Sequence, residues 1–248
     1  MNSVFAIAGH ELRRLFVSPL AWITLAAVEL LLAIFFFVLV YQFLNAPGVA
    51  EIGVTNFVGA GLLQVTGILL LLVTPFVTMR LFSEEYRSGS LKLLLSSPVT
   101  LTQIVLGKYL GIYTFLLIML AIIAAMPLSL AVGTTLDFGQ LGAGLLGLAL
   151  LMAAFAAIGL FISTLTAQPA VAAITTFAVL FILWILNLAA SSATEHVAAV
   201  LSYLSLLQHY NALLKGVFNS VDVVFYVLLV LLFLILTIWR LDGERLHG

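Results

Sequence analysis

Charged residues are scarce in this chain of 248 residues, and cysteine is absent. Lys, Arg, Asp and Glu together make up 8% of the sequence, against about 25% in a typical soluble domain. Such a composition excludes a soluble globular domain, a disordered tail and a nucleic-acid-binding domain, because each of these needs charge or low hydrophobicity. Without cysteine, the chain has neither a disulfide framework nor a thiolate metal site.

Long apolar runs are what the sequence has in abundance. Hydrophobic residues make up 64% of the chain, and a helix needs roughly 20 of them to cross a bilayer core of about 30 Å. Each such run is expected to be helical, because lipid offers the backbone no hydrogen-bond partners. The sequence therefore predicts an all-α polytopic membrane protein with six transmembrane helices, at about Leu20–Phe43, Phe57–Met79, Ile104–Leu130, Leu141–Leu165, Val171–Ala190 and Val223–Trp239.

The basic residues predict the orientation of these helices. Six spans place both termini on one side, and eight of the nine basic residues fall there: Arg13, Arg14, Arg80, Arg87, Lys92, Lys108, Arg240 and Arg245. The opposite side holds only Lys215. Because Lys and Arg accumulate in cytoplasmic loops, both termini and the loop 80–103 are predicted to face the cytoplasm.

Residues 1–19 are predicted to form an amphipathic helix that lies in the inner membrane interface. Apolar side chains recur there at near-helical spacing, while Glu11, Arg13 and Arg14 fall mostly elsewhere on the helical wheel. Pro19 then turns the chain into the first span, because the residue before a proline avoids the helical region. The alternative is a frayed terminus with stop-transfer charges. Residues 20–248 make up the six-helix domain.

The loop 80–103 is the one sizeable polar stretch, and it also contains a leucine cluster. The second helix is predicted to extend through Tyr86 and to stop at Gly89. A short helix is expected next, and Thr100 with Gln103 fits a capping box that opens the third span. The leucines need a cover, because an exposed apolar cluster is costly. The cover is another protein, the chain's own helix ends or the lipid headgroups; the leucines are Leu91, Leu93, Leu94 and Leu95.

Residues 191–220 form a second stretch that does not span the membrane. An apolar stripe from Val197 to Leu207 predicts a helix at the outer interface, or one that dips partway into the membrane. Asn219 and Asp222 are predicted to provide the N-cap and a first-turn acid of the sixth span.

Two residues inside the spans stand out. Glu29 is the one acid well within a span, roughly 12 Å from its start. No basic residue of this chain lies deep enough to pair with it. The carboxyl is therefore protonated, faces a wet cavity or meets another subunit; the plainer interpretation is a neutral acid hydrogen-bonded to a nearby Ser or Thr. Pro75 removes a helix hydrogen bond and is predicted to kink the second span.

Motifs for catalysis are missing from the sequence. The run 142–147 matches G-x-G-x-x-G but follows no strand, so it does not indicate a dinucleotide site. It predicts a helix-packing face instead, because small residues recur at about every fourth position. No phosphate-binding G-x-x-x-x-G-K-[ST] motif is present, and the four histidines lack metal-ligand spacing. The chain is thus not expected to be an enzyme or to bind a metal or cofactor.

Five segments give the chain a resemblance to a known family. They read FVTMRLFSEE at 76–85, GSLKLLL at 89–95, QIVLGK at 103–108, AIGLFISTL at 157–165 and GVFNSVDVV at 216–224. Together with the order of the spans, they resemble an ABC-2-type (ABCG-like, type V) ABC transporter permease, and more specifically the permease subunit of the gliding-motility-type system. The likeness covers essentially the whole chain.

The resemblance implies a set of partners and a location. A separate cytoplasmic ABC ATPase dimer would bind ATP and Mg²⁺. A second permease subunit would complete the pair, either a homologous chain with a large extracytoplasmic domain or a second copy. The protein would be a multi-pass protein of the bacterial cytoplasmic (inner) membrane. Residues 83–97 would be the ATPase-coupling segment, comprising the apolar anchors Leu91, Leu93 and Leu94 and the polar rim Glu84, Glu85, Arg87 and Lys92.

Three functions remain open from the sequence. The first is a permease driven by a partner ATPase, which either exports a substrate or performs mechanical work on an extracytoplasmic partner. The second is a proton-coupled secondary carrier with Glu29 as the proton site; inverted repeats would support it, and none is visible. The third is a structural membrane anchor.

Overall fold

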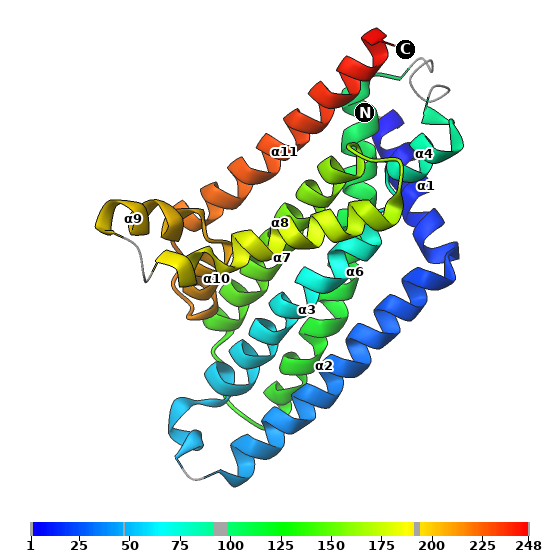
Figure 1. Ribbon diagram of the computed structural model, residues 1–248. Helices are drawn as coiled ribbons and strands as arrows, with labels where there is room; N and C mark the ends of the chain where they lie inside the picture. Colours follow the sequence, from blue (N-terminus) through cyan, green and yellow to red (C-terminus); the bar gives the residue numbers. More distant parts are fainter. Residues whose placement is uncertain (1, 47, 92–98, 191–193, 248) are drawn as a thin grey trace.

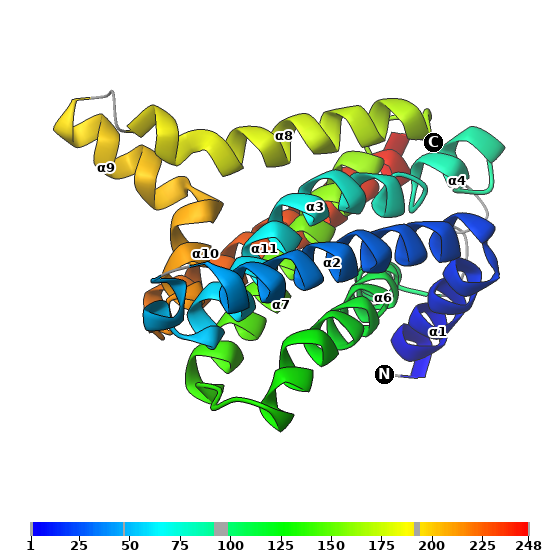
Figure 2. The same ribbon diagram turned by 90° about the horizontal axis from the view of Figure 1, so that it is seen from below.

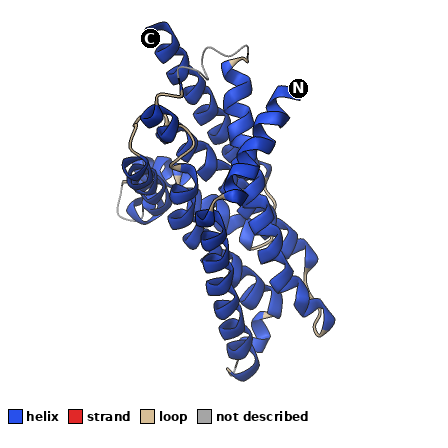
Figure 3. Cartoon of the chain, turned by 90° about the vertical axis from the view of Figure 1, so that its right-hand side faces the viewer, coloured by secondary structure: helices blue, strands red, loops and turns tan. Residues whose placement is uncertain are grey.

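The structure, a computed structural model, describes residues 2–46, 48–91, 99–190 and 194–247. These residues are helical and contain no strand (Figures 1 and 3). The elements are α1 (Asn2–Val17), α2 (Pro19–Asn45), η1 (Val49–Ile52), η2 (Thr55–Ala60), α3 (Gly61–Thr78), α4 (Ser83–Ser88), α6 (Leu101–Ser129), η3 (Leu130–Val132), α7 (Phe138–Ser163), α8 (Pro169–Ala190), α9 (Glu195–Leu204), α10 (Leu206–Leu214) and α11 (Ser220–His247).

Six helical stretches of the described chain are long and apolar enough to cross a membrane, which confirms the predicted fold class. They are α2, η2 with α3 and α4 (Thr55–Ser88), α6 with η3, α7, α8 and α11, and each overlaps a predicted span. Two spans continue further than predicted: the second runs to Ser88 and the last passes Trp239. The helix α11 continues beyond Trp239 to His247, so the charged residues that follow Trp239 are helical.

The helix α7 forms the centre of the bundle. Every residue from 151 to 160 is buried, and glycines on this helix allow its neighbours to approach closely. A Cβ added at Gly147 would lie 2.9 Å from the Leu213 Cβ of α10, and one at Gly144 would lie 2.8 Å from Leu63 Cδ1 of α3. The predicted use of these small residues in helix packing is thus confirmed.

Two predicted helix boundaries at one end of the bundle are confirmed. The helix α1 stops at Val17, and Pro19 opens α2. Thr100 and Gln103 form a capping box at the start of α6, with each backbone N–H donating to the other side chain. Both termini, α1 and α4 lie at this end (Figure 1). We call it the basic end, after Arg13, Arg14, Arg80, Arg87, Lys108, Arg240 and Arg245.

The opposite end carries the predicted outer helical stretch. Residues 191–193 lie outside the described part of the chain, and the rest forms α9 and α10, which meet at a bend of 65° (Figure 2). Tyrosine hydroxyls hold α10 to its neighbours. Tyr210 donates to the Leu63 carbonyl of α3 at 2.6 Å, and Tyr226 of α11 donates to the Leu206 carbonyl at 2.8 Å.

A buried histidine joins this bent pair to α11. His209 Nδ1 lies 2.6 Å from Asp222 Oδ1, and Nε2 lies 2.8 Å from the Tyr203 carbonyl oxygen. The imidazole also stacks on the Phe225 ring, with the centroids 4.1 Å apart. Asp222 is in the first turn of α11 as predicted, but its carboxylate is taken up by a side chain that the sequence did not connect with it.

Substituting this histidine should loosen the opposite end of the bundle. In His209→Leu, the buried carboxylate of Asp222 loses its partner, so we expect a loss of about 2–3 kcal/mol of stability. Thermal unfolding in detergent checks this. The matched control is His10→Leu, since His10 is exposed on α1. Equal melting temperatures for the two variants would contradict a structural role for the pair.

Candidate functional site

The site is at the basic end, where the second span breaks into two helices. The second span extends through Tyr86 as predicted and ends at Ser88, but it is interrupted: α3 ends at Thr78, and a turn over residues 79–82 separates it from α4. Pro75 lies inside α3, one turn before this end. The Thr78 hydroxyl donates back to the Thr74 carbonyl at 2.9 Å. The predicted stop at Gly89 is confirmed, with a left-handed φ of 74° that favours glycine.

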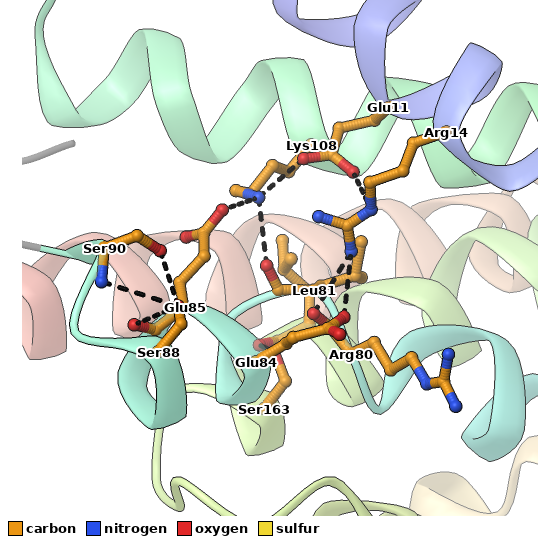
Figure 4. A network of polar contacts seen from close by, with 11 residues as sticks. Glu11, Arg14, Arg80, Leu81, Glu84, Glu85, Ser88, Ser90, Lys108 and Ser163 are labelled. Carbon is orange, nitrogen blue, oxygen red and sulfur yellow. Dashed lines mark hydrogen bonds and ion pairs between the residues drawn. The ribbon is translucent and has the colours of Figure 1, made fainter. Parts of the chain in front are cut away.

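Lys108 of α6 fills the space beside this break and gathers three groups around its ammonium (Figure 4). Its Nζ donates at 2.6 Å to Glu11 Oε1 of α1, at 2.6 Å to Glu85 Oε1 of α4 and at 2.9 Å to the Leu81 carbonyl of the turn. The lysine side chain is 2% exposed and that of Glu11 is 5% exposed. We call Glu11, Lys108 and Glu85 the buried triad.

Two glycines of α6 bring α1 close enough for this contact. A Cβ at Gly107 would lie 2.6 Å from Ile7 Cβ, and one at Gly111 would lie 2.8 Å from Glu11 Cβ and 3.0 Å from the Ala8 carbonyl oxygen. The spacing is that of a G-x-x-x-G motif, which allows two helix backbones to meet. The helix α1 is therefore packed on α6 through its acidic side, instead of presenting Glu11 to water.

Arg14 extends the triad toward the surface. Its Nε lies 3.6 Å from Glu11 Oε2, and its Nη2 lies 3.9 Å from Glu84 Oε2 and 3.3 Å from the Arg80 carbonyl oxygen. The cluster thus contains three carboxylates and two cations within the described residues. Of the three acids, Glu11 and Glu85 face Lys108, and Glu84 alone is exposed.

The buried triad ties α1, α4 and α6 together at the basic end. A buried ion pair loses several kcal/mol when one partner is removed, because the other charge is left uncompensated. The triad therefore favours displacement of α1, α4 and the end of α6 as one body. Among the described residues, no group of three or more His, Asp or Glu side chains is arranged so that it could hold a metal ion.

The structure separates the predicted coupling residues into three groups. Glu84 and Arg87 are exposed on α4, while Glu85 turns inward to the triad. Leu91, predicted as an apolar anchor, is 5% exposed and packs in the chain's own core. That position agrees with the alternative in which the loop leucines cover the chain's own helix ends. The predicted short helix and three predicted coupling residues lie outside the described part of the chain: Lys92, Leu93 and Leu94.

Glu11 and Lys108 are the residues that the sequence analysis missed. Both were interpreted only through their charge, as part of the polar side of an interfacial helix and as a marker of orientation. Two signals were available: Lys108 interrupts an apolar helix, and it lies between Gly107 and Gly111. A charged side chain between two close-contact glycines indicates a neighbouring helix that brings the opposite charge.

Glu29 lies in α2, away from the triad. Both of its carboxyl oxygens are shielded by this chain, and neither has a hydrogen-bond partner among the described residues. The proposed hydrogen bond to a nearby Ser or Thr is therefore not found in the described part of the chain. Val28 and Leu32, which are buried, are its neighbours on the helix.

We expect Glu29→Gln to fold as well as the unsubstituted protein. The amide keeps the shape of the carboxyl and removes a group that is costly to hold in the membrane. The melting temperature in detergent should not fall, and transport assays then test the role of the carboxyl. Altered transport would show that it meets a group from outside the described residues, whereas unchanged transport would favour a purely structural role.

A groove adjoins the site between α3, α4 and α8. It has a volume of about 1330 Å³, larger than the roughly 300–1,000 Å³ of typical ligand pockets. Its lining changes from apolar to polar toward the basic end. The lining residues are Leu72, Pro75, Phe76, Met79, Arg80, Glu84, Arg87, Ser88, Gln168, Pro169, Ala170, Ala173, Ile174 and Phe177.

Comparison with known proteins identifies the family. A family model described as "ABC-2 family transporter protein" matches residues 5–246. The chain belongs to the ABC-2 transporter family. This ABC-2 protein is thus a multi-pass membrane protein and a transporter's membrane domain, and the match includes both the buried triad and the groove. No curated protein matches it significantly.

Proposed function

We propose that this ABC-2 protein is the permease subunit of an ABC transporter of the ABCG-like, type V architecture, similar to the gliding-motility-type permeases. A separate cytoplasmic ATPase dimer binds ATP and Mg²⁺ and docks on the segment 83–97. A second permease subunit completes the membrane part. The basic end then faces the cytoplasm of a bacterial inner membrane, as the distribution of Lys and Arg predicts.

The observation that carries this proposal is the buried triad. Through Glu85, the short cytoplasmic helix α4 is tied by a 2.6 Å ion pair to α6, and through Lys108 to α1. A displacement of α4 is therefore transmitted to the end of α6 and to α1. A permease needs such a connection when ATP is hydrolysed in another chain.

The exposed face of α4 supplies the docking surface. Glu84 and Arg87 are both exposed there and offer charges of opposite sign to a partner. Leu91 is enclosed by this chain, so apolar anchoring falls to the leucines that follow it in sequence. A few such anchors are expected to provide most of the docking energy.

The groove supports substrate export in preference to mechanical work. A subunit that only transmits force needs tight packing, whereas a substrate needs a path bounded by the spans. The groove opens beside α4, where force from the ATPase would arrive, and Pro75 in its wall lies within one turn of the end of α3.

Purification of the tagged chain in a mild detergent tests the proposal. An ATPase subunit should co-isolate and hydrolyse ATP. Leu93→Asp should reduce its recovery at least about tenfold, because a buried docking anchor becomes a charge. The matched control is Val132→Asp, which places the same charge on a residue that is 95% exposed at the opposite end of the bundle.

Two results would contradict the proposal. The first is the absence of any nucleotide-hydrolysing subunit from the purified material. The second is equal ATPase recovery with Leu93→Asp and Val132→Asp while both variants remain in the membrane. Recovery of the chain alone would favour a proton-coupled secondary carrier or a structural membrane anchor.

A further inference from the structure

The groove between α3, α4 and α8 has two chemically different parts. Leu72 and Phe76 from α3, with Ile174 and Phe177 from α8, line its membrane-facing part. Polar side chains occupy the part at the basic end. Leu72 and Met79 are seven residues apart, which is about 10 Å along a helix. The apolar part thus reaches about a third of the way into a bilayer core of roughly 30 Å.

The charges at the polar part are unbalanced. Arg80 and Arg87 both line the groove and are exposed. Among the described residues, no carboxylate lies within ion-pair distance of either guanidinium. Glu84, the one acid in the lining, already faces Arg14 at 3.9 Å. Figure 4 shows the Arg80 guanidinium directed away from the buried triad.

We infer that this groove binds an anionic amphiphile, a lipid whose acidic headgroup meets Arg80 and Arg87 while its hydrocarbon chain lies against α3 and α8. The inference rests on the proposed function, in which the groove is the substrate path. A guanidinium binds a phosphate or carboxylate through paired hydrogen bonds. The apolar part keeps the hydrocarbon chain in apolar surroundings, so binding of the headgroup does not expose the chain to water.

A second copy of this chain fits the groove less well. In a symmetric contact the same patch meets itself, so Arg80 and Arg87 would face the same unpaired arginines. Such a contact would bury like charges with Glu84, which already faces Arg14, as the one acid of each lining, and this is costly. An acidic lipid supplies the missing negative charge and fills the apolar part at the same time.

Photolabelling of the full chain in phosphatidylcholine nanodiscs tests the inference. The probes are phosphatidylglycerol and phosphatidylcholine with a diazirine at the same acyl position. Labelling of α3 and α8 peptides is divided by labelling of α2, whose lipid-facing side serves as an internal reference. Phosphatidylglycerol should exceed phosphatidylcholine by about tenfold in this ratio. It should also stimulate the ATPase of the co-isolated complex.

Two pairs of variants separate headgroup recognition from chain binding. Arg80→Gln with Arg87→Gln should abolish the preference, whereas Arg13→Gln should keep it, because Arg13 is exposed at the same end outside the groove. Ile174→Trp fills the groove and should reduce labelling by both probes. Its control, Ile182→Trp, changes another exposed isoleucine of α8 outside the groove and should leave labelling unchanged.

Three results would overturn the inference. They are equal labelling by the two probes, a preference that survives loss of both arginines, and a disulfide between two copies through Ile174→Cys that accompanies an unlabelled groove. The labelling needs no ATPase, so it fails or succeeds independently of the docking experiment. A labelled groove without an ATPase would reject ATP-driven transport and keep the lipid site.

Discussion

Replacing Lys108 with methionine should destabilise the protein by about 3–5 kcal/mol. Methionine fills much of the space of the lysine, so the loss comes mainly from the charge. The partly buried Glu85 would lose its cation, the buried Glu11 would keep only the longer contact with Arg14 at 3.6 Å, and the Leu81 carbonyl would lose a donor. The melting temperature in detergent is expected to fall by about 10 °C or more.

The same site provides a rescue that separates stability from coupling. Glu11→Gln and Glu85→Gln, added to Lys108→Met, remove the stranded charges and should restore most of the stability. If the triad transmits force, ATPase stimulation by substrate should stay low in the triple variant. An unchanged melting temperature in Lys108→Met alone would show that the lysine is not buried with its two acids.

Replacing Gly111 with leucine should separate α1 from α6. A side chain at this position meets Glu11 Cβ at 2.8 Å and the Ala8 carbonyl oxygen at 3.0 Å, and a backbone atom cannot swing aside. Overpacking of this kind costs about 3 kcal/mol. Limited proteolysis should then release α1, which in the unsubstituted protein is held along its length.

Gly142→Leu is the matched control for this prediction. Gly142 lies near the start of α7, and nothing lies within 4 Å of a Cβ added there. Its proteolysis pattern should equal that of the unsubstituted protein. Equal protection of α1 in both variants would mean that α1 does not depend on the close approach at Gly111.

The spans were predictable from the sequence because one strong force determines them. A membrane requires long apolar helices, so hydropathy alone located all six, although the second and the last continue beyond their predicted ends. Local capping chemistry was equally readable, as Thr100, Gln103 and Gly89 show. The break between α3 and α4 could not be predicted in this way. It involves Lys108, which reaches the Leu81 carbonyl from another helix.

Only part of the site could be predicted from the sequence. The predicted segment 83–97 was found through its polarity and its leucines, and α4 lies there. Its internal partners were missed because Lys108 lies 23 residues from Glu85 along the chain, and Glu11 lies 97 residues from Lys108. Pairing over such separations follows from helix packing, and helix packing here depends on glycines whose role appears only when the opposing helix is in place.

The close packing of α7 determines which helices of the protein are free to move. Its glycines contact α3 and α10 so closely that sliding along these helices would produce immediate collisions. The helix α7 therefore stays fixed relative to α3 and α10. The helices α2 and α8 carry many exposed apolar residues and pack less closely on α7 than α11 does, so an alternating cycle would move these two helices around a centre of α3, α7, α10 and α11.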